Sequence, residues 1–123
     1  MPHLHVEYTR NVSELEPEKL LLKLNHVLMA TGQFANEADI KARAVPLDHF
    51  KVGISPVERA FVYVRLAILS GRPVDVKQKL SADLLAALHE GVRLPAGVEV
   101  QFGVDIVDMD RDAYAKWRGR AFS

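Results

Sequence analysis

A proline in second position can do chemistry that an internal proline cannot. If Met1 is removed, Pro2 becomes the chain terminus and presents a secondary amine, and methionine is usually trimmed when the next residue is small. A terminal amine ordinarily has a pKa of about 7.7–8.0, and the pKa of proline starts higher. An apolar pocket or nearby cations must therefore disfavour the ammonium before Pro2 can act as a base. The alternative is that Pro2 only begins a strand.

Three basic residues are placed where they could hold a carboxylate. Arg72 lies in the stretch SGRPV, between an expected strand and the N-terminus of an expected helix. There a guanidinium can bind a carboxylate through two hydrogen bonds, and helix-end amides add to the attraction. Lys41 and Arg43 alternate on another expected strand, so both project to one side. The alternatives are a solvated turn residue for Arg72 and solvated strand-edge cations for the other two.

An aromatic residue and two histidines complete the candidates. Phe50 lies in an expected central loop, where it either shields a site from water or packs within the loop. His3 and His5 share a strand face, as some metal ligands do, but no third ligand has a suitable spacing. We therefore expect no metal, and we expect His3 to neighbour the site because it follows Pro2.

The first half of the chain predicts a strand, a helix and a strand. Apolar residues alternate over residues 2–9, which is typical of a half-buried strand. The stretch KLLLKLNHVLMATG has helical spacing, with Pro17 allowed in the first turn and Gly32 at the position of a C-terminal cap. A second strand is expected from Asp39 to Val45 and is ended by Pro46.

The second half repeats this order after a loop over residues 46–59. The stretch AFVYVRLAILSG is nearly continuous in apolar, β-branched and aromatic residues, which predicts a central strand. A helix follows over residues 71–91, then a turn at Pro95 and Gly97, then a strand over residues 98–109. The last stretch, RDAYAKWRGRAF, is expected to be a short helix or an arm that packs on a neighbouring subunit.

A β-α-β unit written twice predicts a single α/β domain, more finely α+β. Its two halves are about 1–46 and 60–108, followed by a C-terminal arm. Right-handed crossovers would put both helices on one face of a four-stranded mixed sheet. The central strand has apolar groups on both faces, and two helices cannot cover both. We therefore expect a homo-oligomer built by packing of sheet faces.

Composition excludes several classes of protein. The 123 residues include sixteen basic and sixteen acidic ones, which argues against a broad nucleic-acid or acidic-membrane surface. Cysteine is absent, so disulfides and thiolate metal sites are excluded. The sequence also has no signal-peptide pattern and no apolar run of transmembrane length. We expect a cytoplasmic protein.

Three landmarks resemble a known family. The start MPHLHVEYT, the segment IKAR and the stretch AFVYVRLAILSGRPVDVKQKL are similar, in order and spacing, to 5-carboxymethyl-2-hydroxymuconate isomerase of the tautomerase superfamily. The resemblance runs over nearly the whole chain. The stretch SGRPVDVKQKL also resembles the Gly-Arg-led helix start of the small 4-oxalocrotonate tautomerases.

The resemblance implies a tautomerase-like fold, a homotrimer with sites near subunit interfaces, and proton transfer between carbon atoms of an unsaturated keto or enol acid. It implies no metal and no cofactor. Pro2 would be the catalytic base, and the substrate would be a dicarboxylate held by Arg72 together with Lys41 or Arg43. Phe50 and His3 would lie beside it. A member of the family would have an arginine where this chain has Lys41. Lysine is a point charge and lacks the planar guanidinium group that binds a carboxylate through two hydrogen bonds.

Two alternatives stay open because of that departure. The same proline could serve hydration or dehalogenation of an unsaturated acid, with Lys41 and the central loop setting the substrate. The chain could instead be a trimeric binding protein whose Pro2 is inert, which is the case if Met1 is retained and the Pro2 nitrogen is an amide.

Overall fold

Four strands form one mixed sheet in the order β2-β1-β3-β4 in the computed structural model, which describes residues 1–121. β1 runs parallel to β2 and antiparallel to β3, and β3 runs parallel to β4. The strands are β1 (His3–Thr9), β2 (Lys41–Leu47), β3 (Arg59–Leu69) and β4 (Glu99–Met109).

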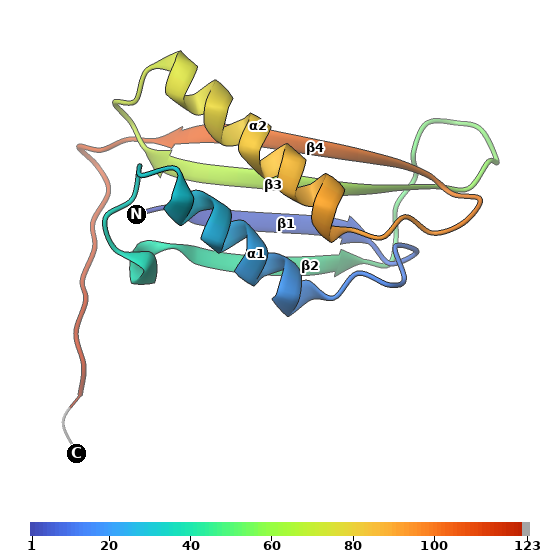
Figure 1. The fold of residues 1–123 in the computed structure, drawn as a ribbon, viewed down its shortest axis with the longest axis horizontal. Helices are drawn as coiled ribbons and strands as arrows, with labels where there is room; N and C mark the ends of the chain where they lie inside the picture. The colour runs from blue at the N-terminus through green and yellow to red at the C-terminus, as the bar shows by residue number, and fades with distance from the viewer. Residues whose placement is uncertain (122–123) are drawn as a thin grey trace.

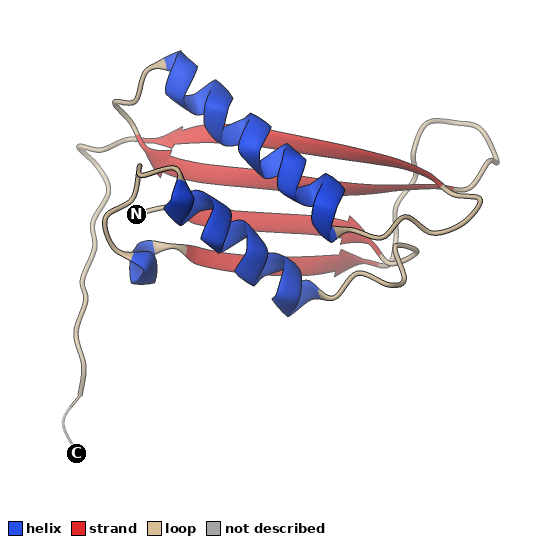
Figure 2. Ribbon diagram, in the orientation of Figure 1, coloured by secondary structure: helices blue, strands red, loops and turns tan. Residues whose placement is uncertain are grey.

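Two helices connect the parallel strand pairs and cover one face of the sheet, as the sequence predicts. α1 (Pro17–Ala30) joins β1 to β2, and α2 (Val74–Gly91) joins β3 to β4. Both lie on the same side of the four strands (Figures 1 and 2). The expected cap at the end of α1 is confirmed, since Gly32 has a φ of 76° and its N–H bonds to a carbonyl of the last turn. Within residues 1–121, no helix is long and apolar enough to cross a membrane.

The core lies between this sheet face and the two helices. Alternate residues of β1 and β3 point into it, and the helices contribute residues at helical spacing. Side chains that are fully buried there include Leu4, Val6, Val64, Leu66, Leu24 and Leu84. Strict alternation fixes the register of β1 and β3, because a slip of one residue would turn these groups toward solvent.

The other sheet face has no helix over it. At its centre the Tyr63 hydroxyl donates to Asp105 over 3.1 Å and accepts from the Arg65 guanidinium over 3.1 Å. The pattern of β3 predicts apolar groups on both faces. The uncovered face is more polar than the pattern of β3 alone predicts, because polar residues of β1 and β4 also project from it.

The second strand begins and ends two residues later than the sequence predicts. Asp39 closes a short 3₁₀ helix, η1 (Glu37–Asp39), whose cap Asn36 accepts from the Ala38 N–H. Pro46 does not end the strand but lies inside it. β2 is an edge strand that pairs only with β1, and an edge strand tolerates a residue without an N–H.

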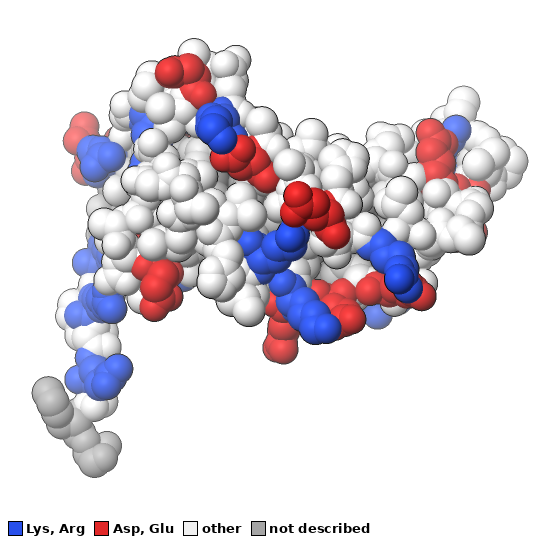
Figure 3. Space-filling view, viewed as in Figure 1, with Lys and Arg blue, Asp and Glu red and all other residues white. Residues whose placement is uncertain are grey.

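The C-terminal segment after β4 is a turn followed by an extended arm that leaves the body of the protein (Figure 1). The sequence predicts either a short helix or an arm over residues 111–122. The helix is wrong for residues 111–121, and residue 122 lies outside the described residues. Figure 3 shows basic side chains spaced along the arm, whereas acidic and basic side chains are mixed over the helices.

Candidate active site

The parallel pairing of β1 with β2 brings the start of both strands together. His3 and Lys41 are register partners, and the Lys41 N–H donates to the Pro2 carbonyl over 3.1 Å. Pro2 itself is buried. Two of the predicted site residues, Pro2 and Lys41, are therefore neighbours because of sheet pairing, although 39 positions separate them in the sequence.

The chain terminus lies among charged groups. Burial lowers the pKa of the Met1 amine most, Asp39 opposes this, and Lys41, Arg72 and Lys116 lower it further. An amine in such surroundings loses its proton at a lower pH than an ordinary terminus does. This amine is one residue away from the Pro2 nitrogen.

Arg72 reaches the same end of the sheet from the turn between β3 and α2. Gly71 before it has a φ of 125°, a conformation that glycine adopts readily. The Arg72 side chain donates to the Gln33 side chain over 3.1 Å and to the Gln33 carbonyl over 3.0 Å. Its guanidinium lies 5.0 Å from the centre of the Phe34 ring. Burial, and secondarily Arg111, lowers the pKa of Arg72. The loop after α1 therefore holds this cation in place.

His3 links the second predicted cation of β2 to the C-terminal arm. Its Nδ1 lies 2.9 Å from Arg43 Nη2, and its Nε2 lies 3.1 Å from the Tyr114 hydroxyl. Burial lowers the pKa of His3, followed by the charges of Arg43, Lys41 and the terminal amine. A neutral imidazole fits these contacts, because Nδ1 then accepts from the guanidinium and Nε2–H donates to the hydroxyl.

Asp39, Tyr114 and Lys116 are neighbours of this site that the sequence alone did not reveal. Lys116 Nζ lies 2.7 Å from Asp39 Oδ1 and 2.7 Å from Met1 Sδ. The arm was expected to pack on another subunit, but these residues contact their own chain. The basic and aromatic composition of the arm was the one available signal, and it does not say where the arm lies.

Phe50 lies at the opposite end of the sheet. Its ring packs edge-on against Phe61, with centroids 6.4 Å apart. Phe61 is six residues along β3 from Ala67, the register partner of His3. Six strand residues span about 20 Å. Within one chain, Phe50 therefore does not meet Pro2, whereas the other predicted site residues cluster around it.

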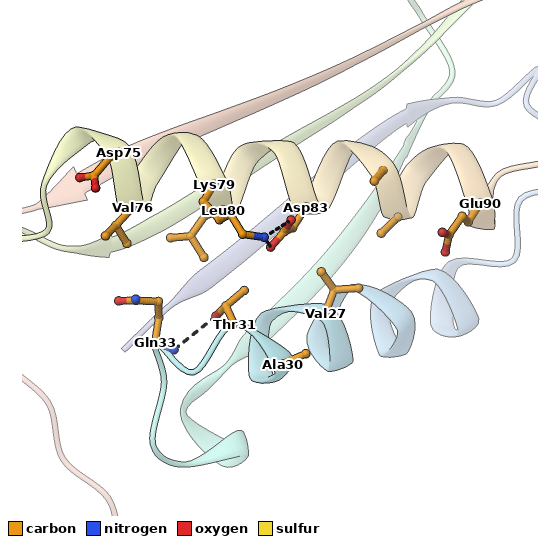
Figure 4. Close-up of a pocket in the computed structure, with 12 residues that line it drawn as sticks. Val27, Ala30, Thr31, Gln33, Asp75, Val76, Lys79, Leu80, Asp83 and Glu90 are labelled. Carbon is orange, nitrogen blue, oxygen red and sulfur yellow. Dashed lines mark hydrogen bonds and ion pairs between the residues drawn. The ribbon is translucent and has the colours of Figure 1, made fainter.

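The groove between the two helices adjoins this cluster through Gln33, the partner of Arg72. It has a volume of about 680 Å³ and is lined mainly by residues of α1 and α2, among them Val27, Leu80 and an ion pair of Lys79 with Asp83 (Figure 4). None of the predicted site residues lines it. The cations predicted for the site therefore lie at the chain terminus and do not line this groove.

Across residues 1–121, no three His, Cys, Asp or Glu side chains gather in a group that could hold a metal ion. His5, a candidate in the sequence, instead has its Nε2 at 3.2 Å from Glu7 Oε1 on the uncovered sheet face.

Comparisons with known proteins agree with the fold. The sequence model of 5-carboxymethyl-2-hydroxymuconate isomerase matches residues 2–116. The crystal structure of a 5-carboxymethyl-2-hydroxymuconate isomerase from Deinococcus radiodurans R1 is 32% identical, with a TM-score of 0.87 over 96% of this chain and 90% of that chain.

Two further structures share the fold at lower identity. A 5-carboxymethyl-2-hydroxymuconate delta-isomerase is 18% identical, with a TM-score of 0.69 over 97% of this chain and 89% of that chain. A protein described as a fused 4-OT wild-type symmetric trimer is 20% identical, with a TM-score of 0.70 over 97% of this chain and 94% of that chain. Among curated protein sequences, none matches this chain.

Proposed function

The chain belongs to the 5-carboxymethyl-2-hydroxymuconate isomerase family and is thus an isomerase with the tautomerase fold, and on that premise we propose that Pro2 is its catalytic base. The reaction needs no cofactor. Its substrate is an unsaturated 2-hydroxy or 2-keto dicarboxylate such as 5-carboxymethyl-2-hydroxymuconate. Removal of Met1 frees the secondary amine that the reaction requires.

The proposed step moves one proton and shifts one set of double bonds. The Pro2 nitrogen takes the proton of the 2-hydroxy group, and the O–H electron pair forms the carbonyl. The double bonds shift along the chain, and the prolinium returns the proton to a carbon atom. In the reverse sense the same amine removes a proton from an allylic carbon. No atom is gained or lost, and the amine ends unprotonated.

The observation that carries the proposal is the surroundings of the terminus. Burial lowers the pKa of the Met1 amine, one residue before the Pro2 nitrogen, and the cations Lys41, Arg72 and Lys116 lower it further while Asp39 opposes them. We expect the same surroundings to act on the Pro2 amine once Met1 is removed. The same positive field attracts a dianionic substrate to the base and stabilises the dienolate charge that develops in the reaction. One cluster thus supplies both the free base and the anion site.

The carboxylates have two candidate anchors. Arg72 offers a planar guanidinium whose Nε and Nη2 donate to Gln33 and whose carbon lies over the Phe34 ring. A held guanidinium loses less freedom when it binds a carboxylate. Lys41 is the second anchor, and its Nζ donates to the Asp39 carbonyl over 2.8 Å. Arg43 is engaged with His3, so we assign it a supporting role.

We also propose that the chain assembles as a homotrimer through its uncovered sheet face. The fold is shared with a protein described as a symmetric trimer. An assembly of this kind would let Phe50 of one copy reach the site of another, which would reconcile its predicted role with its position at the far end of the sheet. Sedimentation would give the oligomeric state directly.

The test is an ultraviolet assay of 5-carboxymethyl-2-hydroxymuconate conversion, with protein whose mass confirms loss of Met1. Pro2→Ala should lower kcat/KM by about 100-fold or more, because general-base catalysis contributes on that order. Pro17→Ala, in the first turn of α1, is the matched control and should keep full activity. Full activity in Pro2→Ala, or in a fraction whose mass retains Met1, would refute the role of the amine.

Lys41 is the reason to test a second reaction. A lysine at this place holds a carboxylate as a point charge and less specifically than an arginine. The same base could then add water to an unsaturated acid, or remove a halide from one. A panel of unsaturated mono- and dicarboxylates separates these reactions, because only isomerisation leaves the composition of the substrate unchanged.

A further inference from the structure

We propose that Lys116, on the C-terminal arm, is a positioning residue that neutralises Asp39 beside the chain terminus and so lets Pro2 work as a base. The inference rests on the proposed function, because it concerns the same amine. It adds a residue that lies more than a hundred positions from Pro2 and outside both β-α-β units.

The ion pair of Lys116 with Asp39 is short and largely screened from water. Lys116 Nζ lies 2.7 Å from Asp39 Oδ1, and the two side chains are 23% and 21% exposed. The same Nζ lies 2.7 Å from Met1 Sδ, so the pair borders the residue that directly precedes Pro2. A charge pair at this exposure acts through a lower effective dielectric constant than one in open solvent, and its loss is felt more strongly by neighbouring charges.

The arm is fixed on both sides of the N-terminal strand, so this contact is part of the fold. Arg111 Nε donates to the Ser70 carbonyl over 2.9 Å, just after β3. Three residues later, the Tyr114 hydroxyl lies 3.1 Å from His3 Nε2. Lys116 follows and meets Asp39. Three successive contacts thus lead the arm across the sheet end that holds Pro2.

Charged groups from four segments of the chain face the Met1 amine beside Pro2. Asp39 comes from η1, Lys41 from β2, Arg72 from the turn before α2, and Lys116 from the arm. From β1, His3 acts as a neutral neighbour, since burial and nearby cations lower its pKa. The nearby Arg43 and Arg111 add positive charge.

The balance among these groups decides whether the amine is free. Asp39 raises the pKa of the Met1 amine, whereas Lys116 lowers it and also lowers the pKa of Asp39 by its hydrogen bond. The Pro2 nitrogen lies one residue further along, so both groups act on it in the same sense. If Lys116 were neutral, the Asp39 carboxylate would keep its full charge and lose its partner. The ammonium form of the terminus would then be favoured, and a higher pH would be needed to release the base.

The experiment compares the pH profiles of three variants. Lys116→Gln should move the acid limb of kcat/KM to higher pH, giving about 3- to 10-fold lower kcat/KM below the midpoint and little change on the alkaline plateau. Asp39→Asn should move the limb to lower pH. The double variant should return close to the parent, because it removes both charges of one pair. Arg118→Gln removes a charge from the same arm and should leave the profile unmoved.

A second readout separates this inference from the proposed function. The titration of the terminal amine is followed through the pH dependence of its alkylation, measured by mass spectrometry on protein without Met1. Lys116→Gln should raise the midpoint of that titration, whatever the reaction. An unmoved amine midpoint, or an equal loss of activity at every pH, would mean that Lys116 only holds the arm and would overturn the inference. Full activity in Pro2→Ala would instead refute the proposed function.

Discussion

The two ends of the sheet have the same backbone plan but opposite chemistry. At one end β1 and β2 begin side by side, with His3 and Lys41 in register. At the other end β3 and β4 begin side by side, with Arg59 and Glu99 in register. There the Arg59 side chain forms an ion pair with Glu99, with 2.8 Å between Nε and Oε2. The positive charge at that end is matched by an acid on the neighbouring strand.

At the first end the matching acid is missing from the neighbouring strand, because Lys41 occupies the place that Glu99 has in the other unit. Arg72 adds a second cation, and the chain terminus adds an amine. We propose that the domain consists of two halves, about 1–46 and 60–108, and this difference indicates how they diverged in use. Repeating a β-α-β unit provides two similar sheet ends, and one change of charge sign decides which end can receive an anion.

The largest test of this comparison removes one arginine from each end. Arg72→Ala should lower kcat/KM by about 10- to 100-fold, because a charge-assisted hydrogen-bond pair to a carboxylate is lost. Arg59→Ala should keep kcat/KM close to the parent and lower the free energy of unfolding by at most about 1 kcal/mol, since its ion pair is partly exposed. Steady-state kinetics and urea unfolding measure the two effects. Similar losses of activity from both variants would show that the ends do not differ in the assembled protein.

A smaller effect tests whether the two ends meet between copies. Phe50→Ala should raise KM about threefold if Phe50 covers the site of another copy, because one apolar contact with the substrate is lost. It should also lower the free energy of unfolding by about 1 kcal/mol through loss of the edge-on contact with Phe61. Phe50→Leu keeps an apolar side chain and is the control for KM. A stability loss with unchanged KM would confine Phe50 to loop packing at its own end.

The smallest effect concerns the pH dependence of stability. The pKa of His3 is lowered from 6.5 in the folded chain, so below about pH 6.5 the unfolded chain binds protons that the folded chain does not. Stability should therefore fall as the pH drops from 7 toward 5, and His3→Asn should reduce that slope. Urea unfolding at several pH values measures it. His26→Asn, on the exposed face of α1, is the control, and an equal slope in the His3 variant and the parent would contradict the expectation.

Most of the fold follows from local pattern. The alternation in β1 and β3 and the helical spacing of Leu20, Leu24 and Leu28 predict these elements correctly, because each has a core-facing period that differs from its neighbours. The predicted bounds of β2 were wrong. Proline interrupts a strand only where the sheet needs the backbone N–H that proline lacks, and the local sequence does not indicate that β2 is an edge strand.

Only some residues of the candidate site could be predicted from the sequence. Pro2, Lys41 and Arg72 were identified through their place before a strand or helix and through the family resemblance. Lys116 and Tyr114 have no periodicity, and their partners are more than 70 positions away. Contacts made by an irregular arm depend on the path of the chain after β4, and that path is a tertiary property.

The proposed base is defined by where it stands in the polypeptide and not by its side chain. Any residue or domain fused ahead of Pro2 would turn its nitrogen into an amide, even if every contact around Lys41 and Arg72 survived. If Pro2 is the base, a partner domain joined after the C-terminal arm would leave the amine free, whereas one joined ahead of Pro2 would block it until it was cleaved off. The proposed chemistry thus makes the two ends of the chain unequal as points for gene fusion.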